Sequence, residues 1–184
     1  TINYAKESKY IKKIFVSTDN KDTKKLSLKL GAMAPFLRPK SLSAQHIDII
    51  SAVKFSLNEL EKNKIFPDLI VLMTENFPFR SKDLHDKMLK KTIDNNYDSL
   101  FVVKKEIGTV FYNDKLLIDG TIPKELQEKK VLTSRIGICT ILRPEKIRLG
   151  SIFEGKIGTY VLDDQLSFLE INKSNQSKLE KFLY

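Results

Sequence analysis

Apolar and polar positions along this chain form blocks that predict strands and helices in turn. Short apolar runs typical of buried parallel strands lie at residues 13–18, 68–73 and 99–103. Apolar residues recur at helical spacing over residues 22–30, 44–63 and 81–95. This alternation predicts an α/β fold with a doubly wound, mostly parallel, Rossmann-like sheet.

The second half of the chain departs from this alternation. A small β-hairpin is predicted around Asn113 and Asp114, with arms at residues 109–112 and 116–119. Further strands are expected at residues 135–142, 156–162 and 167–171, and helical segments at residues 122–130, 144–149 and 174–184. We therefore expect a single domain over residues 1–184, in which residues 105–135 form a small β/α appendage.

The first predicted strand ends in hydroxyl and carboxylate side chains, Ser17, Thr18 and Asp19. Ligands of open α/β sheets bind beyond the carboxyl ends of the strands, so these residues stand where such a fold places its chemistry. The alternative is that Asp19 or Asn20 only caps the helix that follows. The local pattern leaves both interpretations open.

The composition is basic, with 32 Lys and Arg against 23 Asp and Glu and a formal net charge of +9. Such a balance favours anionic partners. However, the lysines are spread in pairs along the chain, which is typical of a lysine-rich surface; a nucleic-acid-binding module is an alternative that only the net charge favours. The single cysteine excludes an internal disulfide and fits a reducing compartment. No apolar run has transmembrane length, so we expect a cytoplasmic protein without a membrane partner. Because the lysines are spread out, we expect no nucleic-acid partner either.

Several familiar catalytic signatures are absent from the sequence. There is no Walker phosphate loop and no glycine-rich dinucleotide fingerprint. His46 and His85 lie far apart within helical patterns, and with one cysteine they disfavour a zinc site. Ser17 has no nucleophile-elbow context, which disfavours a serine hydrolase.

Two motifs, in order and about one helix apart, carry a family resemblance. Residues 16–19 read VSTD, and residues 31–32 and 35–39 read GA and PFLRP. This combination resembles the acylneuraminate cytidylyltransferase family, the CMP-sialic acid synthetases. Residues 78–80, which read PFR, resemble the Pro-x-Arg loop of that family, and residues 156–172 resemble its closing strands.

The resemblance implies a nucleotide-diphospho-sugar transferase-like fold and a nucleotidyltransferase activity. CTP and a nine- or eight-carbon sugar acid would give a CMP-sugar and pyrophosphate, with Mg²⁺ as cofactor. The anomeric hydroxyl of the sugar would attack the α-phosphate, a reaction that depends mostly on positioning and charge neutralisation. The resemblance also implies a homodimer, formed through residues 105–135.

The resemblance assigns roles to six residues and identifies no catalytic one. Arg38 would bind the nucleotide, and Thr74, Arg80 and Phe153 would lie at the sugar-acid site. The ordinary alternatives are a solvated loop arginine for Arg38, a surface arginine at a helix start for Arg80, and a core phenylalanine for Phe153. The magnesium ligands would be Glu170 and Asn172.

The sequence also departs from the family pattern. Thr74 replaces a glutamine, Ile136 replaces an asparagine, and Glu170 with Asn172 replaces a pair of aspartates. A glutamate and an amide still offer oxygen ligands to Mg²⁺, with one negative charge where two are expected. These substitutions favour an alternative, a catalytically silent homologue that serves as a binding or assembly module. The phosphate loop and first strand of the family would precede Thr1, so we expect an N-terminally incomplete domain.

Overall fold

The computed structural model describes residues 1–44, 47–106, 108–123, 126 and 131–172. The helices are α1 (Ile2–Lys6), α2 (Lys21–Lys29), α3 (Ile49–Lys62), α4 (Leu84–Asn95) and α5 (Pro144–Leu149), with 3₁₀ turns at Lys40–Leu42 and Leu166–Phe168. The strands are β1 (Ile70–Leu72), β2 (Ser99–Lys105), β3 (Val110–Tyr112), β4 (Lys115–Ile118), β5 (Leu132–Ser134), β6 (Thr140–Leu142) and β7 (Ile157–Val161).

The main sheet is mixed in direction. β6 lies between β1 and β2 and is antiparallel to both, whereas β7 pairs in parallel with β2 along Ser99–Val103 and β5 pairs antiparallel with the end of β2. The α/β class is confirmed, and the mostly parallel pairing is corrected: β1, β2 and β7 share one direction, and β5 and β6 run against it. A continuous apolar run shows that a strand is buried but not which way it points.

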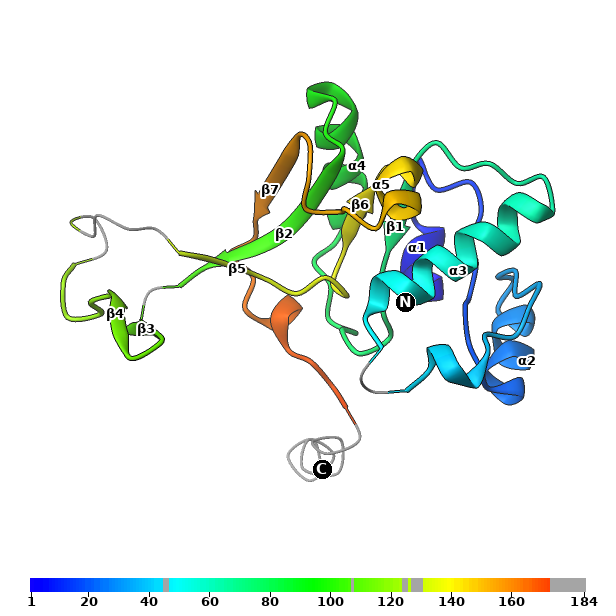
Figure 1. The fold of residues 1–184 in the computed structure, drawn as a ribbon, viewed down its shortest axis with the longest axis horizontal. Helices are drawn as coiled ribbons and strands as arrows, with labels where there is room; N and C mark the ends of the chain where they lie inside the picture. The colour runs from blue at the N-terminus through cyan, green and yellow to red at the C-terminus, as the bar shows by residue number, and fades with distance from the viewer. Residues whose placement is uncertain (45–46, 107, 124–125, 127–130, 173–184) are drawn as a thin grey trace.

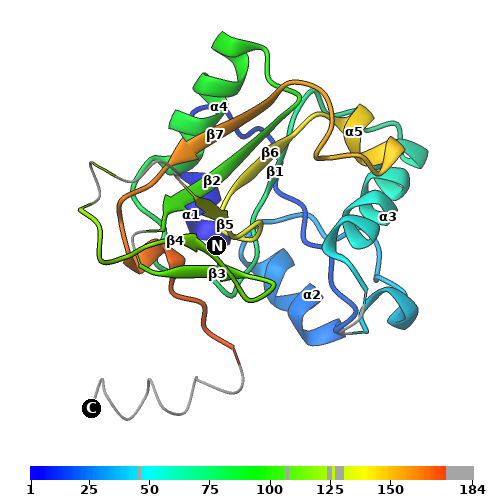
Figure 2. The same cartoon turned by 60° about the vertical axis from the view of Figure 1, so that its left-hand side comes forward.

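Helices cover both faces of this sheet (Figures 1 and 2). Side chains alternate between the faces along β2. Leu100 and Val102 pack in one apolar cluster with Leu84 and Met88 of α4. Phe101 and Val103 pack in a second cluster on the opposite face, together with Leu57 of α3 and Ile147 of α5. The central strand is therefore buried on both sides, as in a doubly wound fold.

The N-terminal segment differs from its prediction. Residues 13–18 form a single parallel bridge, Phe15 to Met33, rather than a strand of the main sheet. The capping interpretation is confirmed for Asn20, whose side-chain oxygen accepts hydrogen bonds from the backbone N–H groups of Asp22 (2.7 Å) and Thr23 (2.9 Å).

Five further expectations meet different outcomes. The hairpin is confirmed, since β3 and β4 flank Asn113 and Asp114, which both have positive φ. The helix predicted from residue 81 begins at Leu84, and the strand predicted at residues 167–171 is replaced by the 3₁₀ turn. The predicted helix at residues 174–184 and most of the one at 122–130 lie outside the described residues. Figure 1 shows the hairpin extending away from the main sheet.

Candidate functional site

Three chain segments meet at one edge of the sheet, beyond the carboxyl ends of β1, β2 and β7. They are residues 74–81 after β1, Glu106 after β2, and residues 162–171 after β7. Because these strands share a direction, their carboxyl ends lie at the same edge, where open α/β sheets bind ligands.

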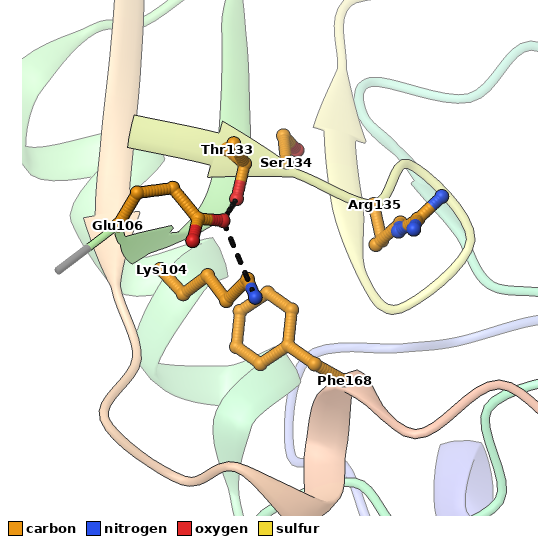
Figure 3. A pocket seen from close by; sticks show the side chains of 6 residues that line it. All are labelled: Lys104, Glu106, Thr133, Ser134, Arg135 and Phe168. Carbon is orange, nitrogen blue, oxygen red and sulfur yellow. Dashed lines mark hydrogen bonds and ion pairs between the residues drawn. The ribbon is translucent and has the colours of Figure 1, made fainter. Parts of the chain in front are cut away.

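A cavity of about 360 Å³ opens at this edge, and we call it the β2 cavity. Its lining comes from β2, β5, the residues that follow them and the 3₁₀ turn: Lys104, Glu106, Thr133, Ser134, Arg135 and Phe168 (Figure 3). Lys104 and Thr133 stand directly opposite each other in the antiparallel pairing of β2 with β5. The strand pairing thus places an ammonium, a carboxylate, hydroxyls and an aromatic ring around one hollow.

The polar groups of the β2 cavity are partly paired. The Glu106 carboxylate accepts a hydrogen bond from Thr133 Oγ1 (2.6 Å) and lies 3.2 Å from Lys104 Nζ. The hydroxyl of Thr133, and then the Lys104 ammonium, lower the pKa of Glu106 despite its partial burial. Arg135 points away from this pair in Figure 3, and its guanidinium has no partner among the described residues. This combination suits an anionic ligand that also carries hydroxyl groups.

Arg80 is a buried arginine, 9% exposed, that holds backbone carbonyl groups together. Its Nε donates to Ile138 O (2.5 Å), and its Nη2 donates to Gly137 O (3.0 Å) and to Thr74 O. Its Nη1 donates to Phe77 O. Burial lowers the pKa of Arg80 from its ordinary value. The structure therefore places Arg80 beneath the loop at residues 74–80, which it links to the turn before β6.

Thr74 belongs to the same junction. Its backbone N–H donates to Gly137 O at 2.8 Å. A Cβ atom on Gly137 would overlap Thr74 Oγ1 and lie 2.9 Å from a ring carbon of Phe77, so only glycine fits against this loop. The loop and the turn are in direct backbone contact, and the side chain of Thr74 faces that contact.

Glu170 lies beside the same loop, with its carboxylate near Asn76 Nδ2 (3.4 Å) and Ile171 N–H bonded to Asn76 O (2.7 Å). Asn172 is exposed two residues further on. Among the described residues, no group of three or more His, Cys, Asp or Glu side chains could hold a metal ion. Mg²⁺ in nucleotide enzymes is often held by one or two carboxylates together with substrate phosphates. Glu170 and Asn172 offer oxygen atoms of the kind that Mg²⁺ prefers, and their predicted role as its ligands stays a prediction.

Arg38 lines a second cavity, of about 250 Å³, with Ser43, Asp48 and Ile49 among its neighbours. Its backbone N–H donates to Thr18 O (2.8 Å), and its Nε donates to Ser43 Oγ (3.1 Å). The Asp48 side chain caps α3 by accepting from Ser51 N–H (2.9 Å). The outer nitrogens of the Arg38 guanidinium have no partner among the described residues, so they remain available to a ligand.

Phe153 lies on the face of the sheet that carries α3 and α5. Its ring is 65% exposed and stacks on Phe101, with centroids 5.1 Å apart. Within one chain, the structure does not bring Phe153 to the β2 cavity. The roles predicted for Phe153, Arg38, Thr74 and Arg80 stay predictions.

None of the residues that line the β2 cavity was predicted as a site residue from the sequence. One signal was present in the sequence: a buried run, residues 99–103, that ends directly in Lys104, Lys105 and Glu106. The opposing residues Thr133 and Ser134 follow much later in the chain, and only the strand pairing reveals that they lie nearby.

Comparison with known proteins identifies the family of this chain. The family model described as Cytidylyltransferase matches residues 1–138. The chain is 31% identical over 83 residues to the CMP-N,N'-diacetyllegionaminic acid synthase of Legionella pneumophila, which covers 45% of this chain and 36% of that protein. It is 27% identical over 101 residues to a pseudaminic acid cytidylyltransferase of Campylobacter jejuni, which covers 55% and 44%. The chain thus matches less than half the length of these relatives.

Solved structures share the fold at low sequence identity. The structure of CMP:2-keto-3-deoxy-manno-octonic acid synthetase complexed with CTP superimposes with a TM-score of 0.65 at 12% identity, covering 98% of this chain and 83% of that one. A 4-diphosphocytidyl-2C-methyl-D-erythritol synthase from Anaerococcus prevotii gives a TM-score of 0.65 at 13% identity, covering 100% and 83%. In the part of the chain that the structure describes, no helix is long and apolar enough to cross a membrane.

Proposed function

Because this chain belongs to the cytidylyltransferase family, we propose that it transfers CMP from CTP to a sialic-acid-like 2-keto sugar acid. The anomeric hydroxyl oxygen of the sugar forms a bond to the α-phosphorus and releases its proton. The bond from that phosphorus to the bridging oxygen breaks, and pyrophosphate leaves with the electron pair. The products are a CMP-sugar and pyrophosphate.

The observation that carries this proposal is the β2 cavity, which we assign to the sugar acid. The cavity lining carries two cationic side chains, Lys104 and Arg135, against one carboxylate, Glu106, and this excess of positive charge favours a ligand with a carboxylate. Glu106, Thr133 and Ser134 offer hydrogen bonds to sugar hydroxyls, and the ring of Phe168 covers the apolar face of a sugar. The junction built by Arg80 and Thr74 supports the neighbouring loop.

We assign the nucleotide to the neighbourhood of Arg38, whose outer guanidinium nitrogens have no protein partner among the described residues. Glu170 through its carboxylate and Asn172 through its amide oxygen would hold Mg²⁺ together with the phosphates of CTP. When bound, this ion would supply neutralisation of the phosphate charge. The cationic groups Arg38, Lys104 and Arg135 orient the two anionic substrates by their charge.

The test is a pyrophosphate-release assay with CTP, Mg²⁺ and three acids: N,N'-diacetyllegionaminic acid, pseudaminic acid and 2-keto-3-deoxy-manno-octonic acid. A CMP-sugar should form with at least one of them. Lys104→Ala should lower kcat/KM for that acid about tenfold, the cost of one charged hydrogen bond. Lys105→Ala is the matched control, because Lys105 is an exposed neighbour on the opposite face of β2. Equal losses in both variants, or no product with any acid, would defeat the proposal.

A second candidate function is a catalytically silent homologue that binds substrate or assembles with other chains. It is favoured by Thr74, Ile136 and Asn172, which stand where the family pattern has a glutamine, an asparagine and an aspartate. Binding of CTP or a sugar acid, measured by titration calorimetry, without pyrophosphate release would support this candidate over the enzyme.

We infer that the protein is a cytoplasmic homodimer. The β3–β4 hairpin carries Phe111, Tyr112 and Leu116, which are 64%, 68% and 53% exposed, and a cluster of exposed apolar side chains on an extended arm favours an interface. The one cysteine, Cys139, is buried and free, which fits a reducing compartment. Light scattering of the protein and of Phe111→Ser tests the dimer, since loss of the apolar ring should shift the mass toward the monomer.

A further inference from the structure

The segment after β7 reaches the β2 cavity without joining the sheet. Its pairing with β2 ends at Val161, and the following described residues form one 3₁₀ turn at Leu166–Phe168. Phe168 of this turn lines the β2 cavity, and Glu170 lies beside Asn76. Contacts other than strand pairing therefore hold this segment at the site.

One set of hydrogen bonds ties the segment to the residue that follows Arg80. We call it the serine–aspartate clamp, formed by Ser81, Asp164 and Ser167. Ser81 Oγ donates to Asp164 Oδ2 at 2.6 Å, and Ser167 Oγ lies 2.7 Å from the same oxygen. The backbone N–H of Ser81 donates to Ser167 Oγ (2.9 Å), and that of Leu166 donates to Asp164 Oδ1 (3.1 Å). Ser167 is fully buried, whereas Ser81 and Asp164 are half-buried.

Asp164 must be ionised for its carboxylate to accept hydrogen bonds from both serine hydroxyls of the clamp. The Ser167 hydroxyl has one proton and two acceptors within reach, Asp164 Oδ2 and Phe79 O at 3.0 Å. An ionised carboxylate is the stronger acceptor. Hydrogen bonds from Ser81 and Ser167 lower the pKa of Asp164. Only hydroxyl and backbone N–H groups face this carboxylate among the described residues, without an ion pair.

We propose that Asp164 is a positioning residue for the β2 cavity: with Ser81 and Ser167 it fixes residues 164–171 against the loop at residues 74–81. Phe168 then forms the wall of the cavity and Glu170 stays beside Asn76. The same loop is held from its other side by the Arg80 guanidinium. The clamp thus couples the segment that carries Phe168 to the loop that Arg80 holds. The catalytic part of this proposal rests on the proposed function, whereas the holding of the segment does not.

The test uses Asp164→Asn, which keeps the shape of the side chain and removes its charge. The matched control is Asp163→Asn, because Asp163 is the exposed neighbour and has no partner among the described residues. Amide hydrogen exchange is followed at Ser81, Leu166, Phe168 and Ile171, whose N–H groups are hydrogen-bonded in the structure. Their exchange should become about tenfold faster in Asp164→Asn and remain unchanged in Asp163→Asn, as expected for loss of a charged hydrogen bond.

Kinetics then separate positioning from simple stability. With the sugar acid of the three above that gives most product, Asp164→Asn should raise KM for that acid on the order of 10- to 100-fold. The KM for CTP and the thermal midpoint should stay near those of Asp163→Asn. Rescue by Asp164→Glu toward the original KM would support the role of the carboxylate.

Three outcomes overturn the proposal. Unchanged exchange in Asp164→Asn would show that the clamp does not hold the segment. Faster exchange with an unchanged KM for the acid would remove the positioning role. If the original chain neither binds nor converts any of the three acids, the proposed function fails and the positioning role falls with it, while the exchange data still decide whether the clamp holds.

The effect of pH has a defined sign. Since the pKa of Asp164 is lowered in the folded chain, the stabilisation of the segment is present above the ordinary carboxyl range and is lost as pH falls through that lowered value. The difference in exchange between the original chain and Asp164→Asn should therefore shrink below about pH 4. A difference in exchange that persists unchanged to the lowest pH would contradict the requirement for an ionised Asp164.

Discussion

Arg80 and Arg38 each lie two or three residues after a proline, yet their surroundings differ in almost every respect. Arg80 is buried, and its guanidinium donates to the carbonyl groups of Thr74, Phe77, Gly137 and Ile138. Arg38 is half-exposed, and one side-chain nitrogen donates to Ser43 Oγ.

This difference teaches what each arginine can do. A guanidinium whose donors are directed at four backbone carbonyls and the Thr1 hydroxyl has little left to offer a ligand, and its charge stabilises the fold of the loop. A guanidinium with unpaired outer nitrogens can form the bidentate contacts that nucleotides and carboxylates favour. We therefore expect mutations at Arg80 to act first on stability and mutations at Arg38 to act first on binding.

The largest expected effect is that of Arg80→Ala. It removes the side-chain donor from the carbonyl groups of residues 77 and 138 and one of the donors from those of residues 74 and 137, and each unsatisfied buried group costs free energy. The free energy of unfolding should fall by about 3 kcal/mol or more, measured by urea denaturation.

The matched control for this loss is Arg148→Ala. Arg148 also donates to an oxygen, Glu61 Oε1 at 2.6 Å, but its side chain is 42% exposed. An exposed ion pair contributes about 0–1 kcal/mol, so this variant should unfold close to the original chain. Equal destabilisation by the two substitutions would show that Arg80 does not stabilise the fold more than an exposed arginine does.

A smaller loss of stability is expected at the turn that contains Gly137, whose carbonyl group accepts a hydrogen bond from Arg80. Gly137→Ala places a methyl group against Thr74 Oγ1 and the Phe77 ring, so we expect a loss of about 2 kcal/mol in the free energy of unfolding. Gly108→Ala, where a Cβ meets open space, should be neutral or slightly stabilising. Adding Thr74→Ala to Gly137→Ala should restore part of the loss; no restoration would mean that the close contact with Thr74 is not the cause.

The sequence predicted those helices, strands and turns whose pattern of apolar, polar or turn residues lies within one continuous segment. The helical spacing of α3, the apolar run of β2 and the turn residues Asn113 and Asp114 are local patterns, and each corresponds to an element. The antiparallel direction of β6 is not local, because a strand of apolar residues satisfies either direction. The segment before Asn20 has the same apolar pattern, yet it forms only the bridge from Phe15 to Met33.

The site was harder to predict for a related reason. Family motifs identified Arg38 and Arg80 but could not show that one is half-exposed and the other buried. The β2 cavity escaped prediction because Lys104, Thr133 and Phe168 come from distant parts of the chain. Their proximity follows from the pairing of β2 with β5 and from the serine–aspartate clamp, and neither leaves a periodic pattern in the sequence.

The smallest expected change in stability, and the one that most sharpens the comparison, is that of Arg38→Ala. Removing a half-exposed side chain with one neutral hydrogen bond should change the free energy of unfolding by no more than about 0.5 kcal/mol. Titration calorimetry should show CTP binding about tenfold weaker, equivalent to about 1.4 kcal/mol. Lys40→Ala, at an exposed lysine of the next turn, is the matched control and should bind CTP like the original chain. If instead Arg38→Ala lowers the free energy of unfolding by several kcal/mol and leaves the affinity for CTP unchanged, then Arg38 has a structural role and does not differ from Arg80.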